Sequence, residues 1–227
     1  MKNIVITGAT SGIGKELAIL LSQNHLVLVL ARDAAKLSAL QQEFPAIKIG
    51  QVDLATDDLK QNADKEIKKH FTQVDVLINN AGTLVNKPVL EISRAEIQNS
   101  FATNAFGLIE MCQATIPFMK SGGHIVNIGS MGGFQGSAKF SGLSVYSATK
   151  GAVATFTECL AEELKETKIK VNCLALGAAQ TEMLSQAFPG YEAPISAKKM
   201  AEYIADFSLN AHEWLNGKII PLSMSTP

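Results

Sequence analysis

The residues with the clearest capacity for chemistry are a tyrosine and a lysine in the segment Tyr146-Ser147-Ala148-Thr149-Lys150. Side chains four positions apart lie on the same face of a helix. A phenol has a reference pKa near ~10 and is a poor acid or base at neutral pH unless its anion is stabilised, which a neighbouring ammonium does. Tyr146 and Lys150 are therefore a candidate acid–base pair, although an exposed tyrosine and a surface lysine are the ordinary alternative.

A second candidate is the glycine-rich turn Thr7-Gly8-Ala9-Thr10-Ser11-Gly12-Ile13-Gly14, which joins an apolar run to a helical pattern. Glycines permit a tight turn and let the backbone approach a ligand closely. The free N–H groups at a helix start then face an anion such as pyrophosphate. Tight strand-to-helix turns also need glycine for geometric reasons alone. In this context we predict dinucleotide binding by Gly8, Thr10, Ser11, Gly12, Ile13 and Gly14.

The residues Ala31-Arg32-Asp33, after the next apolar run, bear on which dinucleotide is bound. A carboxylate at this point hydrogen-bonds the adenine ribose of NAD, whereas an arginine pairs with the 2′-phosphate of NADP. Ala31 stands where an acid would indicate NAD, and Arg32 follows it. Asp33 either repels the phosphate or caps the next helix, and Arg32 is alternatively a solvated charge. The pattern favours NADP(H) over NAD(H).

Short apolar, β-branched runs alternate with longer amphipathic stretches along the chain, which predicts strands alternating with helices. The near-continuous Ile, Val and Leu content suits parallel strands buried on both faces. The predicted strands are Asn3–Thr7, Leu26–Ala31, Ile47–Val52, Val74–Asn79, His124–Gly129, Ile169–Ala175 and Lys218–Leu222. The predicted helices are Gly14–Asn24, Ala34–Glu43, Thr56–His70, Arg94–Met119, Tyr146–Thr167 and Ala197–Leu209.

This order predicts an α/β fold, a doubly wound Rossmann fold with a seven-stranded, mostly parallel sheet and helices on both faces. The chain has 227 residues and no internal repeat or Pro/Ser-rich linker. We therefore expect a single dinucleotide-binding domain over residues 1–227, with a small substrate-loop region near 182–196. The stretch Glu182–Pro194 is expected to be flexible.

The motifs taken together resemble the short-chain dehydrogenase/reductase family. The motifs occur in the order that is typical of that family, and the resemblance extends from Asn3 to about Leu222. In chain order they are the glycine-rich turn, Asn79-Asn80-Ala81-Gly82, Asn104 with Gly107, Ser130 after the fifth strand, and Tyr146 with Lys150. Each motif is modest alone, and the specificity comes from their order and spacing over essentially the whole chain. The resemblance implies hydride transfer between NADP(H) and a ketone, aldehyde or secondary alcohol.

The resemblance also implies a role for each matching residue. Tyr146 would be the proton donor, Ser130 would bind the substrate oxygen, and Lys150 would hold the nicotinamide ribose. Asn104 would sit at a kink in a long helix and hold a water that links the lysine to solvent. Asp53 would bind the adenine amino group, although it is alternatively a helix N-terminal residue. The further residues that we predict to bind the cofactor are Leu54, Asn80, Ala81, Gly82, Ile128, Gly177, Ala179 and Thr181.

The sequence departs from the family pattern in three places. Leu176 replaces a proline before Gly177, which frees a backbone N–H and is expected to loosen the turn. The loop between Ser130 and Tyr146 is about three residues longer than usual, and its Phe134, Phe140 and Leu143 either shape the substrate cleft or fold inward. The tail Pro221-Leu222-Ser223-Met224 replaces an Asp-Gly-Gly sequence that often joins subunits.

Composition excludes several classes of protein. Twenty basic and 21 acidic residues leave a net charge of −1, which gives no electrostatic reason to propose nucleic acid as a partner. No 18-residue apolar run or signal sequence appears, so we expect a cytoplasmic protein without a membrane partner. Three scattered cysteines indicate buried apolar residues and no disulfide framework or zinc site. The four histidines lack metal-ligand spacing and are expected at the surface or at strand edges, with no metal bound.

Two further readings remain open. A 3-oxoacyl-[acyl-carrier-protein] reductase would favour basic residues near the cleft mouth, for which Lys139, Lys198 and Lys199 are candidates. A non-catalytic NADP(H) sensor or scaffold typically loses the tyrosine, lysine or serine, which this chain retains. By resemblance we expect a homodimer or homotetramer formed through the fourth and fifth helices.

Overall fold

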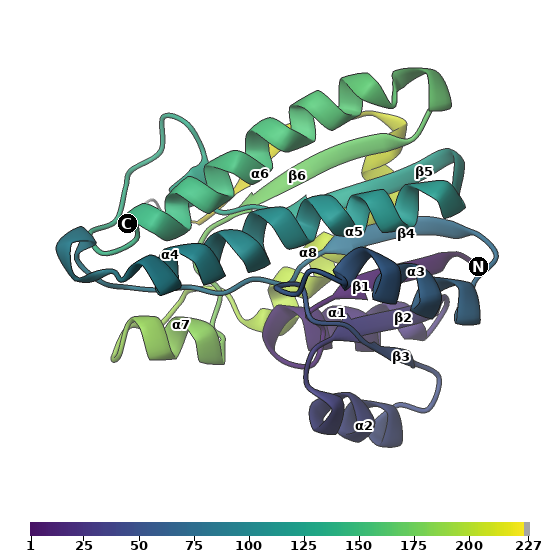
Figure 1. Cartoon of the computed structure of the whole chain (residues 1–227), viewed down its shortest axis with the longest axis horizontal. Helices are drawn as coiled ribbons and strands as arrows, with labels where there is room; N and C mark the ends of the chain where they lie inside the picture. The colour runs from purple at the N-terminus through teal and green to yellow at the C-terminus, as the bar shows by residue number, and fades with distance from the viewer. Residues whose placement is uncertain (225–227) are drawn as a thin grey trace.

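Seven strands form one sheet in the order β3-β2-β1-β4-β5-β6-β7, in a computed structural model that describes residues 1–224 (Figure 1). Every neighbouring pair of these strands is parallel. The strands are β1 (Asn3–Thr7), β2 (Leu26–Ala31), β3 (Lys48–Gln51), β4 (Val74–Asn79), β5 (Met119–Ile128), β6 (Lys170–Leu176) and β7 (Ile219–Leu222). The predicted doubly wound sheet is confirmed, and its described strands are all parallel where the sequence predicted mostly parallel ones. The single domain predicted over 1–227 includes 225–227, which lie outside the described residues.

Helices cover both faces of this sheet (Figure 1). They are α1 (Gly12–Ser22), α2 (Ala34–Glu43), α3 (Leu59–His70), α4 (Arg94–Phe101), α5 (Gly107–Thr115), α6 (Ser144–Glu163), α7 (Glu182–Ala187) and α8 (Ala197–Asn210). One core layer packs α1, α2 and α8 on the sheet, and the other packs α3, α5 and α6. Along β1, Ile4 and Ile6 enter the first layer and Val5 the second. Because successive strand residues point to opposite faces, a strand covered on both sides must be apolar throughout.

The helix predicted over Arg94–Met119 is interrupted and shorter. It consists of α4, a π-helical turn η2 (Ala102–Phe106), α5 and a 3₁₀ turn η3 (Ile116–Phe118). Pro117 stands in the first turn of η3, where its missing N–H ends the α-helical ladder. Met119 pairs with Val74 and begins β5, so its assignment to the helix was wrong.

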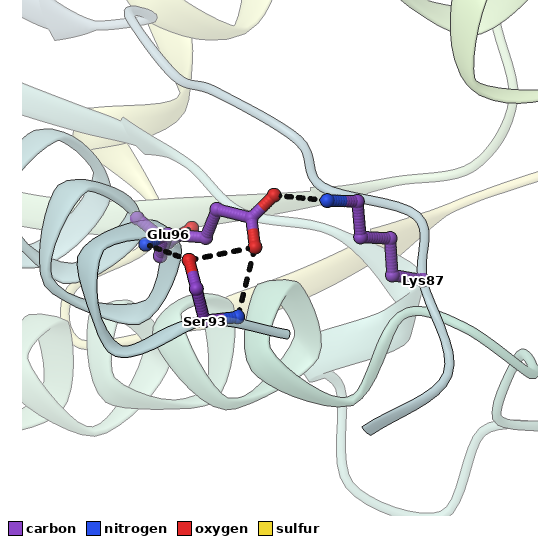
Figure 2. A network of polar contacts seen from close by, with 4 residues as sticks. Lys87, Ser93 and Glu96 are labelled. Atoms are coloured by element: carbon purple, nitrogen blue, oxygen red, sulfur yellow. Dashed lines mark hydrogen bonds and ion pairs between the residues drawn. The ribbon is translucent and has the colours of Figure 1, made fainter. Parts of the chain in front are cut away.

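The start of α4 is fixed by a reciprocal cap, which Figure 2 shows in close-up. Glu96 N–H donates to the Ser93 hydroxyl over 3.2 Å, and the Glu96 carboxylate accepts from Ser93 N–H over 2.8 Å. The same carboxylate forms an ion pair with the ammonium of Lys87. Hydrogen bonds from Lys87 and then from Ser93 lower the pKa of Glu96 to about 2. The cap thus ties the loop after β4 to the first turn of α4.

Other boundaries shift by a few residues. Helix α1 begins at Gly12, two residues before the predicted start, and α3 begins at Leu59, three residues after it. The predicted helix Tyr146–Thr167 is α6 followed by the 3₁₀ turn η5 (Lys165–Thr167). The stretch expected to be flexible contains α7 in its first half. In residues 1–224, no helix is long and apolar enough to cross a membrane.

The expectations for histidine and cysteine were wrong at two positions. Cys112 and Cys173 are buried as expected, whereas Cys159 is exposed on α6. His124 has 0% of its surface exposed, although the histidines were expected at the surface or at strand edges. Its Nδ1 lies 3.0 Å from the Ser208 carbonyl and its Nε2 lies 3.0 Å from Asn172 Nδ2. A neutral ring that donates from Nδ1 and accepts at Nε2 satisfies both contacts.

We predict that this buried histidine makes the fold sensitive to acid. Burial lowers the pKa of His124 from 6.5 to about 4. The unfolded chain therefore binds a proton that the folded chain does not, so stability falls as pH drops from about 6.5 towards about 4, by up to about 3 kcal/mol. Urea unfolding measured at a series of pH values should show this loss in the wild type and a smaller loss in His124→Gln. His25→Gln should change the slope less because His25 is only half-buried. Equal slopes in all three proteins would contradict the prediction.

Candidate functional site

A cleft of about 890 Å³ runs along the carboxyl ends of the strands. The cleft lies at the junction of β1 and β4, from which the later strands are added to the sheet in opposite directions. Open α/β sheets bind their ligands at such a junction. All but one of the residues predicted to act or bind line it, and Asn104 is the exception. They are Gly8, Thr10, Ser11, Gly12, Ile13, Gly14, Arg32, Asp53, Leu54, Asn80, Ala81, Gly82, Ile128, Ser130, Tyr146, Lys150, Gly177, Ala179 and Thr181.

The glycine-rich turn is packed directly on the residues that follow β4. Asn80 Nδ2 donates to the carbonyls of Thr7 and Gly8 over 3.0 and 3.1 Å. A Cβ added to Gly14 would lie 2.5 Å from that same Nδ2, and one added to Gly8 would lie 2.6 Å from Ala81 Cα. Gly8 also has a φ of +66°, which L side chains rarely adopt. The turn therefore needs glycine for close approach as well as for backbone conformation.

The opposite wall at this end comes from the segment after β2. Arg32 is exposed at the cleft, and Lys36 in the first turn of α2 lines the cleft beside it. Asp33 Oδ1 accepts from Lys36 N–H over 3.0 Å, so Asp33 caps α2. Asp53 Oδ1 accepts from Ala55 N–H over 3.0 Å in a turn that precedes α3, so Asp53 is not part of that helix. Two cations and two carboxylates, those of Asp33 and Asp53, therefore stand at this end of the cleft.

Tyr146 lies in the first turn of α6, opposite the end of β5. Its ring is half-buried, as is Ser130, which lies two residues after Ile128, the last residue of β5. Burial raises the pKa of the Tyr146 phenol, and a hydrogen bond with Ser130 partly opposes this. The Ser130 hydroxyl also accepts from Gly132 N–H over 3.1 Å. The expected lowering of the phenol pKa by the lysine is absent, because desolvation by burial is the dominant effect.

Lys150 is 4% exposed and one turn further along α6. Its ammonium donates to the Ile128 carbonyl over 2.8 Å and lies 5.9 Å from the centre of the Tyr146 ring. Burial lowers the pKa of Lys150 to about 8. A buried ammonium with one protein acceptor retains two further N–H donors. Lys150 can therefore bind oxygen atoms of a ligand in the cleft.

Asn104 occupies the π-helical turn between α4 and α5 and is 1% exposed. Its Oδ1 accepts from Thr83 N–H over 2.7 Å, and its Nδ2 donates to the Thr83 carbonyl over 2.8 Å. The same amide donates to Thr149 Oγ1 over 3.1 Å. A Cβ added to Gly82 would lie 3.4 Å from Asn104 Oδ1 and 3.6 Å from Lys150 Nζ. Asn104 thus supports the lysine region from behind the cleft and does not line it.

Three loops form the other end of the cleft. From the longer loop between β5 and α6, Phe140 and Leu143 line the cleft and Phe134 does not. Asn86, after β4, donates from Nδ2 to the Ala187 carbonyl at the end of α7 over 2.8 Å. Figure 1 shows α7 standing apart from the sheet, beyond the carboxyl ends of the strands. The structure thereby joins segments that the sequence separates by about a hundred residues.

The turn after β6 is ordered by pairing with the chain end. Leu176 is 7% exposed and pairs with Leu222, and Gly177 N–H donates to the Leu222 carbonyl over 2.8 Å. A Cβ added to Gly177 would lie 2.5 Å from Ser223 Oγ. Leu176 is therefore the last residue of β6, and the loosening expected from the missing proline stays a prediction.

The family model for short chain dehydrogenase matches residues 2–192 of this chain. The chain belongs to the short-chain dehydrogenase family. An uncharacterized oxidoreductase of Staphylococcus epidermidis is 31% identical over 211 residues, with 89% of each chain covered. An oxidoreductase of Staphylococcus aureus is 31% identical over 208 residues, again with 89% of each covered.

Solved structures share the fold of this short-chain dehydrogenase. A short chain dehydrogenase from Burkholderia cenocepacia in complex with NADP superposes with a TM-score of 0.89 at 24% identity, covering 99% of this chain and 97% of the other. A 3-ketoacyl-(acyl-carrier-protein) reductase from Brucella melitensis complexed with NADH gives 0.86 at 24% identity, covering 97% and 96%. At this identity the likeness establishes the fold alone.

Several residues that line the cleft of this short-chain dehydrogenase were missed by sequence reasoning. They are Lys36, Asn86, Thr103, Met131, Met183, Phe188 and Tyr191. For Lys36 a signal was present, since it falls in the first turn of the helix that Asp33 caps, beside Arg32. Thr103 lies in the π-helical turn η2, and the others lie in the segments after β4 and β5 or on and after α7, where no periodic pattern indicates direction. Within residues 1–224 no group of three or more His, Cys, Asp or Glu side chains is placed to hold a metal ion.

We predict that Gly14→Ala destabilises this short-chain dehydrogenase and weakens dinucleotide binding. The added methyl would press on Asn80 Nδ2, on the Gly8 carbonyl 2.7 Å away and on the Ala9 backbone. Such overpacking costs about 1–3 kcal/mol. The matched control is Gly151→Ala in α6, where the nearest atom to an added Cβ is 3.8 Å away, and where alanine should stabilise the helix by up to about 1 kcal/mol. Thermal unfolding of the two variants measures both changes in stability. An equal change in Gly14→Ala and Gly151→Ala would contradict the steric argument.

Proposed function

We propose that this chain is an NADP(H)-dependent oxidoreductase that transfers a hydride between the nicotinamide and a ketone, an aldehyde or a secondary alcohol. Tyr146 acts as the general acid or base. The observation that carries the proposal is the meeting of Tyr146, Ser130 and Lys150 in the same cleft as the glycine-rich turn. An acid–base group and an oxygen-binding hydroxyl beside a dinucleotide site are the protein's share of carbonyl reduction.

The residues of the cleft suit a phosphorylated dinucleotide. Gly8 and Gly14 let the turn pack closely on Ala81 and Asn80 at the cleft, and the first N–H groups of α1 can bind a pyrophosphate there. Neither Arg32 nor Lys36 forms an ion pair within residues 1–224, so both cations are available to a 2′-phosphate. With Asp33 occupied in capping α2, its carboxylate is less able to compete for them. These contacts favour NADP(H) over NAD(H).

When bound, the nicotinamide supplies or accepts the hydride. In the reducing direction Tyr146 donates its phenolic proton to the carbonyl oxygen as the C–H bond forms, which yields the alcohol. Ser130 donates a hydrogen bond that orients the same oxygen. Burial raises the pKa of Tyr146, so its proton is held until the oxygen of the substrate becomes basic. Lys150 positions the ribose and, with the support of Asn104, returns a proton to Tyr146 through solvent.

The other readings receive less support. Lys139 donates to the Phe134 carbonyl over 2.6 Å, and Lys199 pairs with Glu202 over 2.8 Å. Neither they nor Lys198 line the cleft, which removes the basic residues invoked for an acyl-carrier-protein substrate. A non-catalytic sensor would not require the buried Lys150 beside Tyr146. A homodimer or homotetramer through α4, α5 and α6, in the cytoplasm, remains a prediction.

We predict that Arg32→Ala and Lys36→Ala each weaken NADPH binding by about 10-fold or more and leave NADH binding nearly unchanged. Each removes a charge-assisted hydrogen bond worth about 1.5–3 kcal/mol. Titration with either cofactor, followed by nicotinamide fluorescence, measures both constants. Lys48→Ala is the control, because Lys48 is exposed at the start of β3 and does not line the cleft. Equal affinities for NADPH and NADH that neither mutation alters would refute the NADP(H) assignment.

We predict that Tyr146→Phe lowers kcat for carbonyl reduction by about 10²–10⁴-fold, because the general acid is lost. NADPH binding should survive, since the ring and its packing remain. Tyr203→Phe on α8 is the matched control, as Tyr203 is 42% exposed and outside the cleft lining. Steady-state turnover of a ketone with each variant checks the prediction. Full activity in Tyr146→Phe would assign the proton transfer to another group.

A further inference from the structure

The basic residues of the cleft are unevenly distributed. Only Arg32, Lys36 and Lys150 contribute cations to its lining. Arg32 and Lys36 follow β2, which is separated from β5 by β1 and β4. The Lys150 ammonium is directed to the Ile128 carbonyl behind Tyr146. The end of the cleft beyond Tyr146 and Ser130 therefore receives no free cation from the lining.

Lysines on the neighbouring loops do not supply one. The ammonium of Lys87 is paired with Glu96 at the start of α4 (Figure 2). Lys139 donates to the Phe134 carbonyl over 2.6 Å and to Ser137 Oγ over 2.9 Å. Neither residue lines the cleft. The one charged side chain among the lining residues of this end is Glu182, whose carboxylate accepts from Gln186 Nε2 over 3.2 Å.

The walls at this end are apolar. They are formed by Met131, Phe140, Leu143, Met183, Phe188 and Tyr191. These residues come from the loop after β5 and from the segment around α7. Met183 on α7 and Tyr191 after it are 44% and 40% exposed, so this segment presents large apolar side chains that the rest of the described chain covers only in part. Such side chains gain free energy by contacting an apolar group of a ligand.

We infer that the substrate is an uncharged carbonyl compound carrying an apolar group such as an aryl or alkyl chain, and not a carboxylate or a phosphate. The inference rests on the proposed function and adds the class of substrate to it. An anion at this end would lose hydration without gaining a cation and would face the Glu182 carboxylate. An apolar group would instead remove the exposed parts of Met183 and Tyr191 from water.

The test compares ethyl benzoylformate with benzoylformate, which share the same ketone and phenyl ring and differ in one negative charge. With wild-type protein and NADPH, kcat/KM for the ester should exceed that for the acid by at least about 10-fold, which is the effect of about 1.4 kcal/mol. Binding of each compound to the protein–NADPH complex, followed by nicotinamide fluorescence, should show the same order. Equal values, or a preference for the acid, would overturn the inference.

Two pairs of variants test the residues responsible. Glu182→Gln should raise the acid-to-ester ratio of kcat/KM several-fold, whereas Glu192→Gln, outside the cleft lining, should leave the ratio unchanged. Phe140→Ala should raise KM for the ester several-fold, and Phe134→Ala in the same loop should not. No difference within either pair would show that these side chains do not face the substrate and would contradict the inference.

The design separates this inference from the proposed function. If the ester binds in preference to the acid but neither consumes NADPH, hydride transfer is refuted and the inferred ligand class stands. If both compounds are reduced with the acid preferred, the proposed function stands and the inference fails. Failure of the ester to bind at all would also overturn the inference, since the apolar walls then have no ligand of the stated class.

Discussion

The contact on which the rest of the structure depends is the one between Asn80 and the glycine-rich turn. The Asn80 amide bridges the Thr7 and Gly8 carbonyls, while Thr7 Oγ1 accepts from Asn80 N–H and Ala81 N–H over 3.1 Å each. This joins β1 to β4 where the sheet grows in opposite directions on either side. Two side chains, those of Asn80 and Thr7, thus satisfy backbone groups at the ends of both strands and hold the glycine-rich turn against the loop after β4. The cleft opens at this junction.

A second constraint is the cost of burying Lys150. Its ammonium has one protein acceptor, the Ile128 carbonyl, and burial lowers its pKa to about 8. With that pKa the ammonium stays charged near neutral pH, and Asn104 fixes the adjacent loop through Thr83. The π-helical turn at Ala102–Phe106 places Asn104 where a regular helix would direct the side chain elsewhere. The π-helical turn thus positions the amide that holds Thr83, next to the buried ammonium of Lys150.

The two ends of the cleft differ in character because they are built from different halves of the sheet. Segments after β2 provide the unpaired cations Arg32 and Lys36, whereas segments after β5 and β6 provide apolar side chains and Glu182. Positive charge is therefore concentrated at one end, and the lining of the other end supplies no free cation. Such a division can orient a long, anionic dinucleotide and a smaller apolar compound towards Tyr146 from opposite sides.

The sequence by itself determined the alternation of strands and helices, the parallel sheet and the family, because these follow from local periodicity and from short motifs with fixed backbone geometry. Every residue that it predicted to act or bind, except Asn104, lines the cleft. Only the tertiary structure decided that Phe140 and not Phe134 reaches the cleft, that Asn86 binds the end of α7, and that Met119 belongs to β5. It also decided that His124, which the sequence could not distinguish from a surface histidine, is buried between Ser208 and Asn172. The direction of a loop side chain, and the burial of a polar one, depend on partners distant in the chain, and those partners are fixed only when the sheet and its helices pack.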